Sequence, residues 1–404
     1  MRPAVPIVPL LCIAASALPA QGPTLREALQ IARQHNADIL SARFRIDSAQ
    51  GEQKIARAFP NPAFSSNPNQ PWNYSVTLPL DFTPERWFRT RAAGHGTAAA
   101  NWDAADMERQ ITFQLCQAFT DVLLSERLRE LATERHDILR QVLLADSARL
   151  RAGDLPERDV NKAELELARA EAEMQRAAAH VHATRLALQL LMGVTPPDTA
   201  FGVSGDLAYA PVEIPVDSLR GIASRRPDLR AAQDRVAQTR SLHSLATAQW
   251  IPVPIVSFTR ATAPFGTDGL FSNGTRNAIG FGFTVPLWDW NGGARDRSRA
   301  GVAQAQLEAT HLEAQVANDI ATAVDAYRSA RLLAERYEGG LLDRARRSLE
   351  TARYAYGSGA ISLLELLDAI GTWSDTRSDY YTALHDYWIS VYAVGNAAGR
   401  DFIP

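Results

Sequence analysis

The stretch AIGFGFTVPLWDWNGGARDR, residues 278–297, decides how this chain is interpreted. Large apolar side chains alternate with glycine or threonine at its start, and a period of two predicts a β-strand with one apolar and one small or polar face. The segments on either side have helical patterns instead. A lone strand leaves a row of backbone groups unpaired, so the chain must supply partners for it.

A twin of this strand lies in the first half of the chain. Trp72–Leu80 repeats the alternation and ends in the same Thr-x-Pro-Leu, which places Thr77 207 residues before Thr284. Further matches, at a spacing of 206 residues, join Gly153 to Gly359, Ala163 to Ala369 and Gly193 to Gly399. The sequence therefore predicts a duplicated unit of helix, strand, strand and long helical hairpin.

Residues 1–20 have the features of a secretory signal peptide: Arg2, an apolar run over Ile7–Ala17, and the small residue Ala20 at its end. The run is too short for a spanning helix, which needs about 20 residues. A buried N-terminal helix is the alternative. The expected organisation is a signal peptide over 1–20, a first repeat over 21–193, a linker over 194–217 and a second repeat over 218–404.

Composition and motifs exclude several classes of protein. The 404 residues include 22% charged and 46% hydrophobic side chains, the formal net charge is −3, and there are two cysteines. This composition is typical of a globular protein, and the chain has no net positive charge that would attract nucleic acid. No P-loop, dinucleotide fingerprint or Gly-x-Ser-x-Gly elbow is present. The sequence therefore predicts neither an enzyme nor a cofactor site. His180 and His182 are two residues apart on a predicted helix and point in different directions, so they are not predicted to bind one metal ion together.

The predicted helices are unusually long. From Glu85 to Arg151 there is no proline, and ~65 helical residues reach on the order of 100 Å. The returning helix carries apolar residues at heptad spacing, with small d positions at Ala163, Ala170 and Ala177. This pattern predicts a coiled coil or a helical barrel, and the heptads alone do not decide between them.

Four alternating segments, at about 63–66, 72–80, 252–260 and 277–287, are typical of outer-membrane β-strands, with a small soluble sheet as the alternative. Four strands cannot close a barrel within one chain, so closure requires two chains with 8 strands or three with 12. The side chains expected to face lipid are Trp72, Tyr74, Val76, Leu78, Ile279, Phe281, Phe283 and Val285. Those expected to face the lumen are Gly280, Gly282 and Thr284.

The strand-to-helix joints carry proline and tryptophan. Pro79 and Pro286 are expected to end the strands, and Trp288 and Trp290 to lie near the membrane interface, as in an aromatic girdle. Packing of these aromatic side chains in a core at the joint is the alternative.

These features together resemble the TolC-like outer-membrane efflux proteins over the whole mature chain. The resemblance rests on the doubled unit, the Val/Leu-Pro-Leu strand ends and the turn YGSGAISLLELLDA at 356–369. Within that family, Leu25–Phe64 with its AFPNP at 58–62 is similar to the heavy-metal, CzcC-like branch. The resemblance implies a fold that is mainly α with a membrane β-barrel: a homotrimer sharing 12 strands, four from each chain, continued by a helical barrel.

The resemblance also implies partners and site residues. The partners would be a periplasmic adaptor (membrane fusion) protein, an inner-membrane pump of the resistance-nodulation-division type and outer-membrane lipid. Adaptor contacts would fall on the tips at 151–158 and 357–364, at Gly153, Leu155, Gly359, Ile361 and Ser362. Glu365 and Asp368, and Asp159 in the first copy, would line the periplasmic gate, where threefold symmetry makes rings of carboxylates. Arg158 or Arg353 could pair with these acids.

The leading hypothesis is a passive exit duct in the outer membrane of a Gram-negative-type bacterium, extending into the periplasm. It would export metal cations or small molecules as part of a tripartite efflux system. The alternative is a periplasmic coiled-coil adaptor, which would normally have one helical hairpin rather than two. A secreted hydrolase on a helical scaffold is a third interpretation, without a catalytic constellation behind it.

Overall fold

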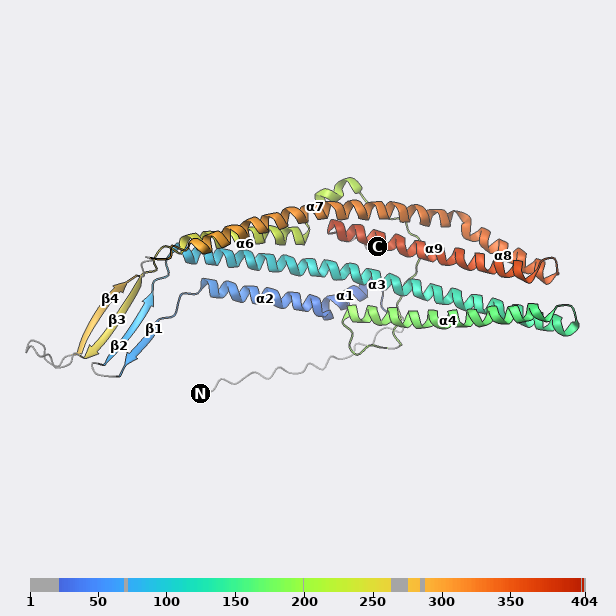
Figure 1. Ribbon diagram of the computed structural model, residues 1–404, viewed down its shortest axis with the longest axis horizontal. Coiled ribbons are helices and arrows are strands. Elements are labelled where there is room, and N and C mark those ends of the chain that lie inside the picture. Colours follow the sequence, from blue (N-terminus) through green and yellow to red (C-terminus); the bar gives the residue numbers. More distant parts are fainter. Residues whose placement is uncertain are drawn as a thin grey trace, which may run out of the picture. The chain divides into compact units, whose positions relative to one another are not determined.

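The computed structural model of the chain describes residues 22–68, 72–198, 200–262, 275–283, 288–400 and 402. The expected signal peptide, Thr284, Val285 and Pro286 lie outside the described residues. The helices of the first half are α1 (Leu25–His35), α2 (Ala37–Arg57), α3 (Pro84–Ala152) and α4 (Glu157–Met192). Those of the second half are η1 (Val216–Ser218), α5 (Leu219–Ala223), α6 (Pro227–Ala248), α7 (Gly292–Arg336), η2 (Tyr337–Leu341), α8 (Leu342–Gly357) and α9 (Leu363–Ala398) (Figure 1).

The chain divides into two compact units that do not follow the two halves of the sequence. One unit combines the residues up to Asn36 with Gln114–Pro211 and Ser329–Ile389, and so contains the turns that join the long helices. The other combines Ala37–Phe113, Val212–Arg328 and the residues from Ser390, and contains the sheet. The proposed limits of the sequence repeats remain a prediction.

The sheet consists of β1 (Ala63–Asn67), β2 (Asn73–Pro79), β3 (Ile255–Thr262) and β4 (Thr275–Gly282), in the spatial order β1-β2-β3-β4. All three pairings are antiparallel, and the register pairs Val76 with both Phe64 and Phe258. The two strand pairs, one from each half of the chain, therefore meet at the contact between β2 and β3. Among the described residues, β1 and β4 each pair along one side only.

The register gathers the apolar side chains on one face. Residues paired across antiparallel strands share a face, so Phe64, Val76, Phe258 and Ile279 form one row, and Leu78, Val256 and Phe281 form the next. Ile279 is 69% and Phe281 83% exposed within the chain. The opposite face carries Ser65, Ser75, Thr77, Ser257, Thr259 and Gly280. One large apolar surface thus lacks a covering element among the described residues.

The observed strands are close to the predicted ones, with differences at the ends. β4 ends at Gly282, so Phe283 lies just past it, and Trp72 lies one residue before β2. Ser65 and Ser75 join β1 to β2 by a hydrogen bond of 2.7 Å between their hydroxyl oxygens. The prolines at 252 and 254 delay the start of β3 to Ile255 because proline has no backbone N–H to donate.

A hydrogen bond from a side chain to a backbone carbonyl occurs at matching places in the two halves of the chain, and it supports the duplication. In the first half, Asn36, between α1 and α2, donates from Nδ2 to the carbonyl of Leu191 at 2.8 Å. In the second half, Arg226 precedes α6 and donates from a guanidinium nitrogen to the carbonyl of Ala397 at 3.0 Å. Leu191 and Ala397 are 206 residues apart, which is the spacing of the sequence match.

The second half departs from the regular pattern at one point. α3 runs through 69 residues without a break, whereas α7 passes into a π-type turn, η2, before α8. Gly340 has φ +97° there, and this left-handed conformation is accessible to glycine at no steric cost. The predicted long helix of the second copy is therefore two helices joined by a kink.

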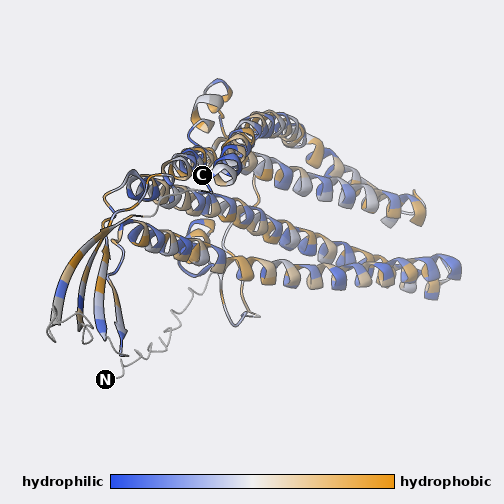
Figure 2. Cartoon of the chain, turned by 60° about the vertical axis from the view of Figure 1, so that its left-hand side comes forward, coloured by the Kyte–Doolittle hydropathy of each residue, from blue (hydrophilic) through white to orange (hydrophobic). Residues whose placement is uncertain are grey.

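Hydrophilic and hydrophobic residues are interleaved along the helices (Figure 2). No helix among the described residues is long and apolar enough to cross a membrane.

Candidate functional site: the two helical tips

Two tight turns join the long helices, and their backbones match residue by residue. At the first tip, Gly153 follows α3 with φ +83° and Asp154 N–H donates to the carbonyl of Arg149 at 2.9 Å. At the second, Gly359 follows α8 with φ +76° and Ala360 N–H donates to the carbonyl of Ala355 at 2.8 Å. This is the Schellman ending, which needs a left-handed residue and so favours glycine.

The two tips differ in how the next helix starts. Ser362 precedes α9 and forms a capping box with Glu365: its N–H donates to Oε2 of Glu365 at 2.8 Å, and Glu365 N–H donates to its hydroxyl at 3.3 Å. Pro156 holds the same place before α4 and forms no side-chain cap. The predicted gate residue Glu365 therefore also has a structural role at the start of α9.

The predicted tip residues lie at the surface of the turns. Gly153, Gly359 and Ser362 are exposed, and Leu155 and Ile361 are half-buried. Ile361 packs against the hydrophobic core beneath the tips. The structure thus leaves the backbone of both turns accessible, while one apolar side chain anchors the second turn to its core.

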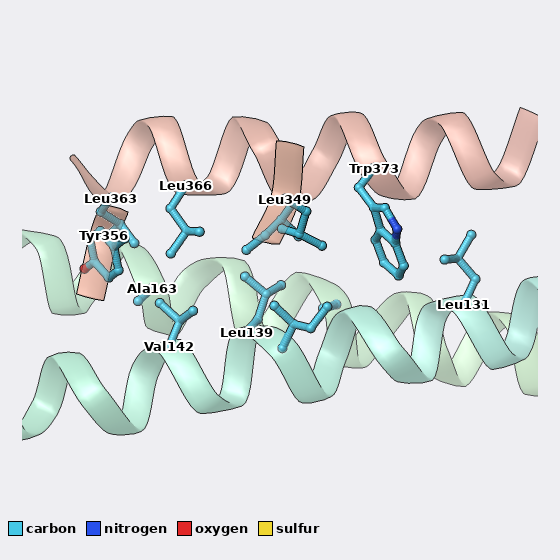
Figure 3. Packing of buried hydrophobic residues seen from close by; sticks show 12 residues of the cluster. Leu131, Leu139, Val142, Ala163, Leu349, Tyr356, Leu363, Leu366 and Trp373 are labelled. Carbon is cyan, nitrogen blue, oxygen red and sulfur yellow. The ribbon is translucent and has the colours of Figure 1, made fainter. Parts of the chain in front are cut away.

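That core joins α3, α4, α8 and α9 (Figure 3). Its side chains point between the helices from both sides, and Leu366 and Ile370 are almost fully buried. Besides Leu366, the members labelled in Figure 3 are Leu131, Leu139, Val142, Ala163, Leu349, Tyr356, Leu363 and Trp373. Because the core includes both hairpins, the position of each tip depends on the other.

A buried hydrogen bond between polar side chains crosses this core. The Tyr356 hydroxyl on α8 donates to Oδ1 of Asp146 on α3 at 2.6 Å, and Asp146 is 0% exposed. The second carboxylate oxygen of Asp146 has no hydrogen-bond partner among the described residues. Burial, and then the hydrogen bond to Asp146, raise the pKa of Tyr356 well above its ordinary value. Sequence reasoning missed this pair because its members are 210 residues apart, and nothing in the turn motif that begins at Tyr356 points to Asp146.

Two further polar links join α9 to α3. Arg377 on α9 forms an ion pair with Glu134, and its guanidinium lies 5.2 Å from the ring centroid of Trp373. His385 contacts Oδ1 of Asp121 at 2.7 Å. Burial alone would lower the pKa of His385, but hydrogen bonds to Asp121 and Asp386 raise it above its ordinary value. The hairpin of α8 and α9 therefore has polar contacts with α3 at three positions along that helix: Asp146, Glu134 and Asp121.

The predicted gate acids face away from the core. Glu365 and Asp368 are exposed and three residues apart, on the side of α9 opposite the buried Leu366. Asp159 is half-buried and accepts a hydrogen bond of 3.2 Å from Nε of Arg158. Arg353 is exposed, and no carboxylate within the described ranges forms an ion pair with it. Of the two arginines predicted as possible partners of these acids, Arg158 contacts Asp159, and Arg353 has no such contact among the described residues.

The two histidines lie on different surfaces of α4. His180 borders a groove with Glu173 and Asp375, and His182 borders another groove with Arg185 and Asp198. Across the part of the chain that the structure describes, no cluster of three His, Cys, Asp or Glu side chains is arranged to hold a metal ion.

The predicted joint residues that the structure describes, Pro79, Trp288 and Trp290, lie between the sheet and the helices that follow its strands. Pro79 is the last residue of β2, and the ends of all four strands nearest to the helices fall at the same edge of the sheet. Trp288 is 94% exposed and Trp290 is also exposed. Asn291, with φ +60°, donates from Nδ2 to the carbonyl of Ala246 at 2.7 Å and sets the start of α7. These tryptophans are therefore not packed in a core of this chain.

Comparison with known proteins agrees with this fold. Over 94% of its length, the chain is 25% identical to the cobalt-zinc-cadmium resistance protein CzcC of Cupriavidus metallidurans, 91% of which is covered. It is similar in structure to the outer membrane channel CmeC of Campylobacter jejuni, with a TM-score of 0.81, 16% identity and coverage of 93% of this chain and 85% of that one. It is also similar in structure to the outer membrane protein VceC of Vibrio cholerae, with a TM-score of 0.78, 21% identity and coverage of 94% of this chain and 97% of that one.

The predicted resemblance to TolC-like channels is confirmed, as is the mainly helical fold with a duplicated unit and a small antiparallel sheet. The model of one family, described as outer membrane efflux protein, matches residues 28–194 and 219–400. The chain therefore belongs to the outer membrane efflux protein family, whose members are outer-membrane channels rather than enzymes.

Proposed function

We propose that three copies of this chain form a passive exit duct through the outer membrane, part of a tripartite efflux system that exports divalent metal cations. The observation that carries this proposal is the sheet. One face is apolar across all four strands, and β1 and β4 present unpaired edges among the described residues. Unpaired backbone is not tolerated in lipid, so neighbouring copies must complete the ladder.

The number of copies follows from the width of the lumen. Eight strands make a barrel that its own side chains fill, whereas twelve leave room for an aqueous path. The face opposite the apolar one carries small neutral side chains, including Ser75, Thr77 and Thr259. Three copies would therefore enclose a lumen that is lined at these positions by small polar side chains.

In this proposal the helical tips form the mouth of the duct, and their acidic side chains supply the charge that selects cations. Glu365 and Asp368 are exposed on one face of α9, and Asp159 is near the equivalent place on α4. Threefold symmetry turns each into a ring of carboxylates, which concentrates cations at a constriction and disfavours anions. The first copy has Lys162 where the second has Asp368, so its contribution to the ring is smaller.

Replacing Glu365 by Gln together with Asp368 by Asn is expected to lower the cation-over-anion preference of single channels in planar bilayers. Gln at position 365 can still accept the hydrogen bonds of the capping box, so the helix start is retained while the charge is removed. The matched control is Glu164→Gln, which removes an exposed acid elsewhere on α4. An unchanged ion preference in the double variant would rule out the acidic ring.

The accessible turns are the proposed docking sites for the periplasmic adaptor, through Gly153, Leu155, Gly359, Ile361 and Ser362. Their exposed backbone and matched geometry offer the adaptor two similar contacts per copy, six per trimer. The inner-membrane pump would supply the driving force, since a duct of this kind moves its cargo passively.

The cargo is proposed from one relative and from charge. CzcC, to which this chain is similar over most of its length, is named for resistance to cobalt, zinc and cadmium, and carboxylate rings suit cations. Small organic molecules are the alternative cargo. A deletion strain that is sensitive to these metals and not to drugs supports metal export, and the reverse pattern supports the alternative.

The duct is tested by fractionation and mass. The protein is expected in the outer-membrane fraction, released only by detergent, with a particle mass of three chains after correction for the detergent. Recovery in the soluble periplasm would favour a periplasmic adaptor, and a mass of two chains would contradict the twelve-stranded barrel.

A further inference from the structure

One row of side chains on the apolar face of the sheet is polar. The register pairs Tyr74 with Ser66 on one side and with Arg260 on the other, and Arg260 with Asn277. All four side chains are exposed, and residues paired across strands lie ~5 Å apart on the same face. The four therefore form a continuous band of hydrogen-bonding groups across the whole sheet.

The row stands at the border of the apolar surface. Directly below it, nearer the helices, is the row that contains Phe64, Phe258 and Ile279. Tyr74 is flanked by Phe64, with ring centroids 6.2 Å apart, and by Trp72, at 5.3 Å. An aromatic side chain with a polar end, held between apolar and polar neighbours, is typical of a membrane interface.

Arg260 is the unexpected member of the row. A charge on the lipid face of a β-barrel is most unfavourable at the midplane of the bilayer and less so near the interface. The described strands contain no Asp or Glu, and within the described part of the chain no carboxylate pairs with Arg260. An anion from outside the chain would stabilise a guanidinium in this position.

The position of the row identifies the leaflet. The four helices that adjoin the sheet in the chain, α2, α3, α6 and α7, meet it at the end marked by Ile255 and Gly282. Arg260 is five residues further along β3, about 17 Å along the strand. With a strand tilt of ~40° this is a rise of about 13 Å, half the height of an apolar band ~25 Å tall. The exposed side chain of Phe283 lies past Gly282, on the helix side of Ile255, so the apolar band begins below Ile255 and the row lies above its middle. If the helices extend into the periplasm, Arg260 belongs to the outer leaflet, towards which its long side chain can extend.

We propose that Ser66, Tyr74, Arg260 and Asn277 bind the phosphorylated sugar headgroup of the outer-leaflet glycolipid, lipid A. The guanidinium supplies a two-pronged donor for the phosphate, and the hydroxyl and amide groups supply donors and acceptors for sugar oxygens. The inference rests on the proposed function, because it requires the apolar face to point to lipid. It adds a specific lipid contact that would anchor each copy in the outer leaflet.

The test uses the full-length protein in phosphatidylcholine nanodiscs, with diphosphoryl lipid A added in steps and the thermal midpoint of the helical circular dichroism signal as readout. Insertion as a trimer in the neutral lipid comes first, and its failure would count against the proposed function rather than against this inference. Lipid A is expected to raise the midpoint, while lipid A without phosphates is expected to have little effect.

Arg260→Gln is expected to require about tenfold more lipid A for the same rise, which corresponds to ~1.4 kcal/mol, since the charge-assisted hydrogen bonds to the phosphate are lost. Arg260→Lys should keep part of the response, and the control Arg140→Gln, an exposed arginine of α3, should respond as the wild type does. A purely structural role for Arg260 would lower the midpoint in phosphatidylcholine alone. An Arg260→Gln response equal to wild type, or an equal rise with inorganic phosphate, would overturn the proposal.

Discussion

Phe281→Lys is expected to remove the assembled protein from the outer membrane. Phe281 lies on the apolar face, paired with Val256 near the end of the sheet that adjoins the helices, and is 83% exposed within the chain. A lysine on the lipid face of a barrel is unfavourable by ~2–4 kcal/mol near the midplane. Three copies in one barrel would add up to about 6–12 kcal/mol at the midplane and less towards an interface, and the upper part of this range is comparable to the whole stability of a typical domain, ~5–15 kcal/mol.

The measurement is the amount of trimer that detergent extracts from the outer-membrane fraction. Thr259→Lys is the matched control, because Thr259 is on the same sheet but on the polar face, paired with Ser75 and Ala278. Its lysine would enter an aqueous lumen, so assembly should be retained. Phe281→Leu should also assemble. If Thr259→Lys abolishes the trimer and Phe281→Lys does not, the two faces are assigned in reverse and the barrel proposal is wrong.

The sequence predicted the fold where local patterns decide it. Alternation over Trp72–Leu80 is visible because a strand has a period of two, and a register slip of one residue would move every side chain to the other face. The glycines of the two tips could be found from their constant spacing. A doubled pattern allows each copy to support the interpretation of the other.

Other features needed the three-dimensional register or packing. Arg260 is not notable in the sequence, because only the pairing of β3 with β2 and β4 places it on the apolar face. The capping box at Ser362 and Glu365 was readable as Ser-x-x-Glu before an apolar run, but the acid was interpreted only as a gate residue. The kink at Gly340 is a further case, since the matching position of the first copy lies inside an uninterrupted helix.

The link between Asp146 and Tyr356 leads to the second prediction, that Tyr356→Phe widens the mouth. The hydroxyl of Tyr356 is the single hydrogen-bond partner of the Asp146 carboxylate among the described residues. Its removal leaves a fully buried carboxylate without a donor. A hydrogen bond to a charged group contributes ~1.5–3 kcal/mol, so α8 should separate from α3 more readily. Single-channel recordings should show the open state favoured by about tenfold or more.

The chain provides its own control for this variant. Tyr354 lies two residues away on α8 and is 82% exposed, so Tyr354→Phe makes the same chemical change without disturbing the core. Asp146→Asn should have a milder effect than Tyr356→Phe, because the amide oxygen can still accept from the hydroxyl and the buried charge is gone. Equal conductance changes in Tyr354→Phe and Tyr356→Phe would show that the buried link does not hold the mouth.

The pH dependence of this link has a definite sign. The pKa of Tyr356 is raised in the folded protein by burial and by Asp146, so its contribution to stability is fully present below the ordinary tyrosine pKa of about 10. It is lost only as the pH rises through the raised value. Wild-type conductance should therefore show no opening step from this group between pH 7 and 9, and Tyr356→Phe should be as open at pH 7 as at pH 9. A wild-type channel that opens steeply within that interval would require a different titrating group to control the mouth.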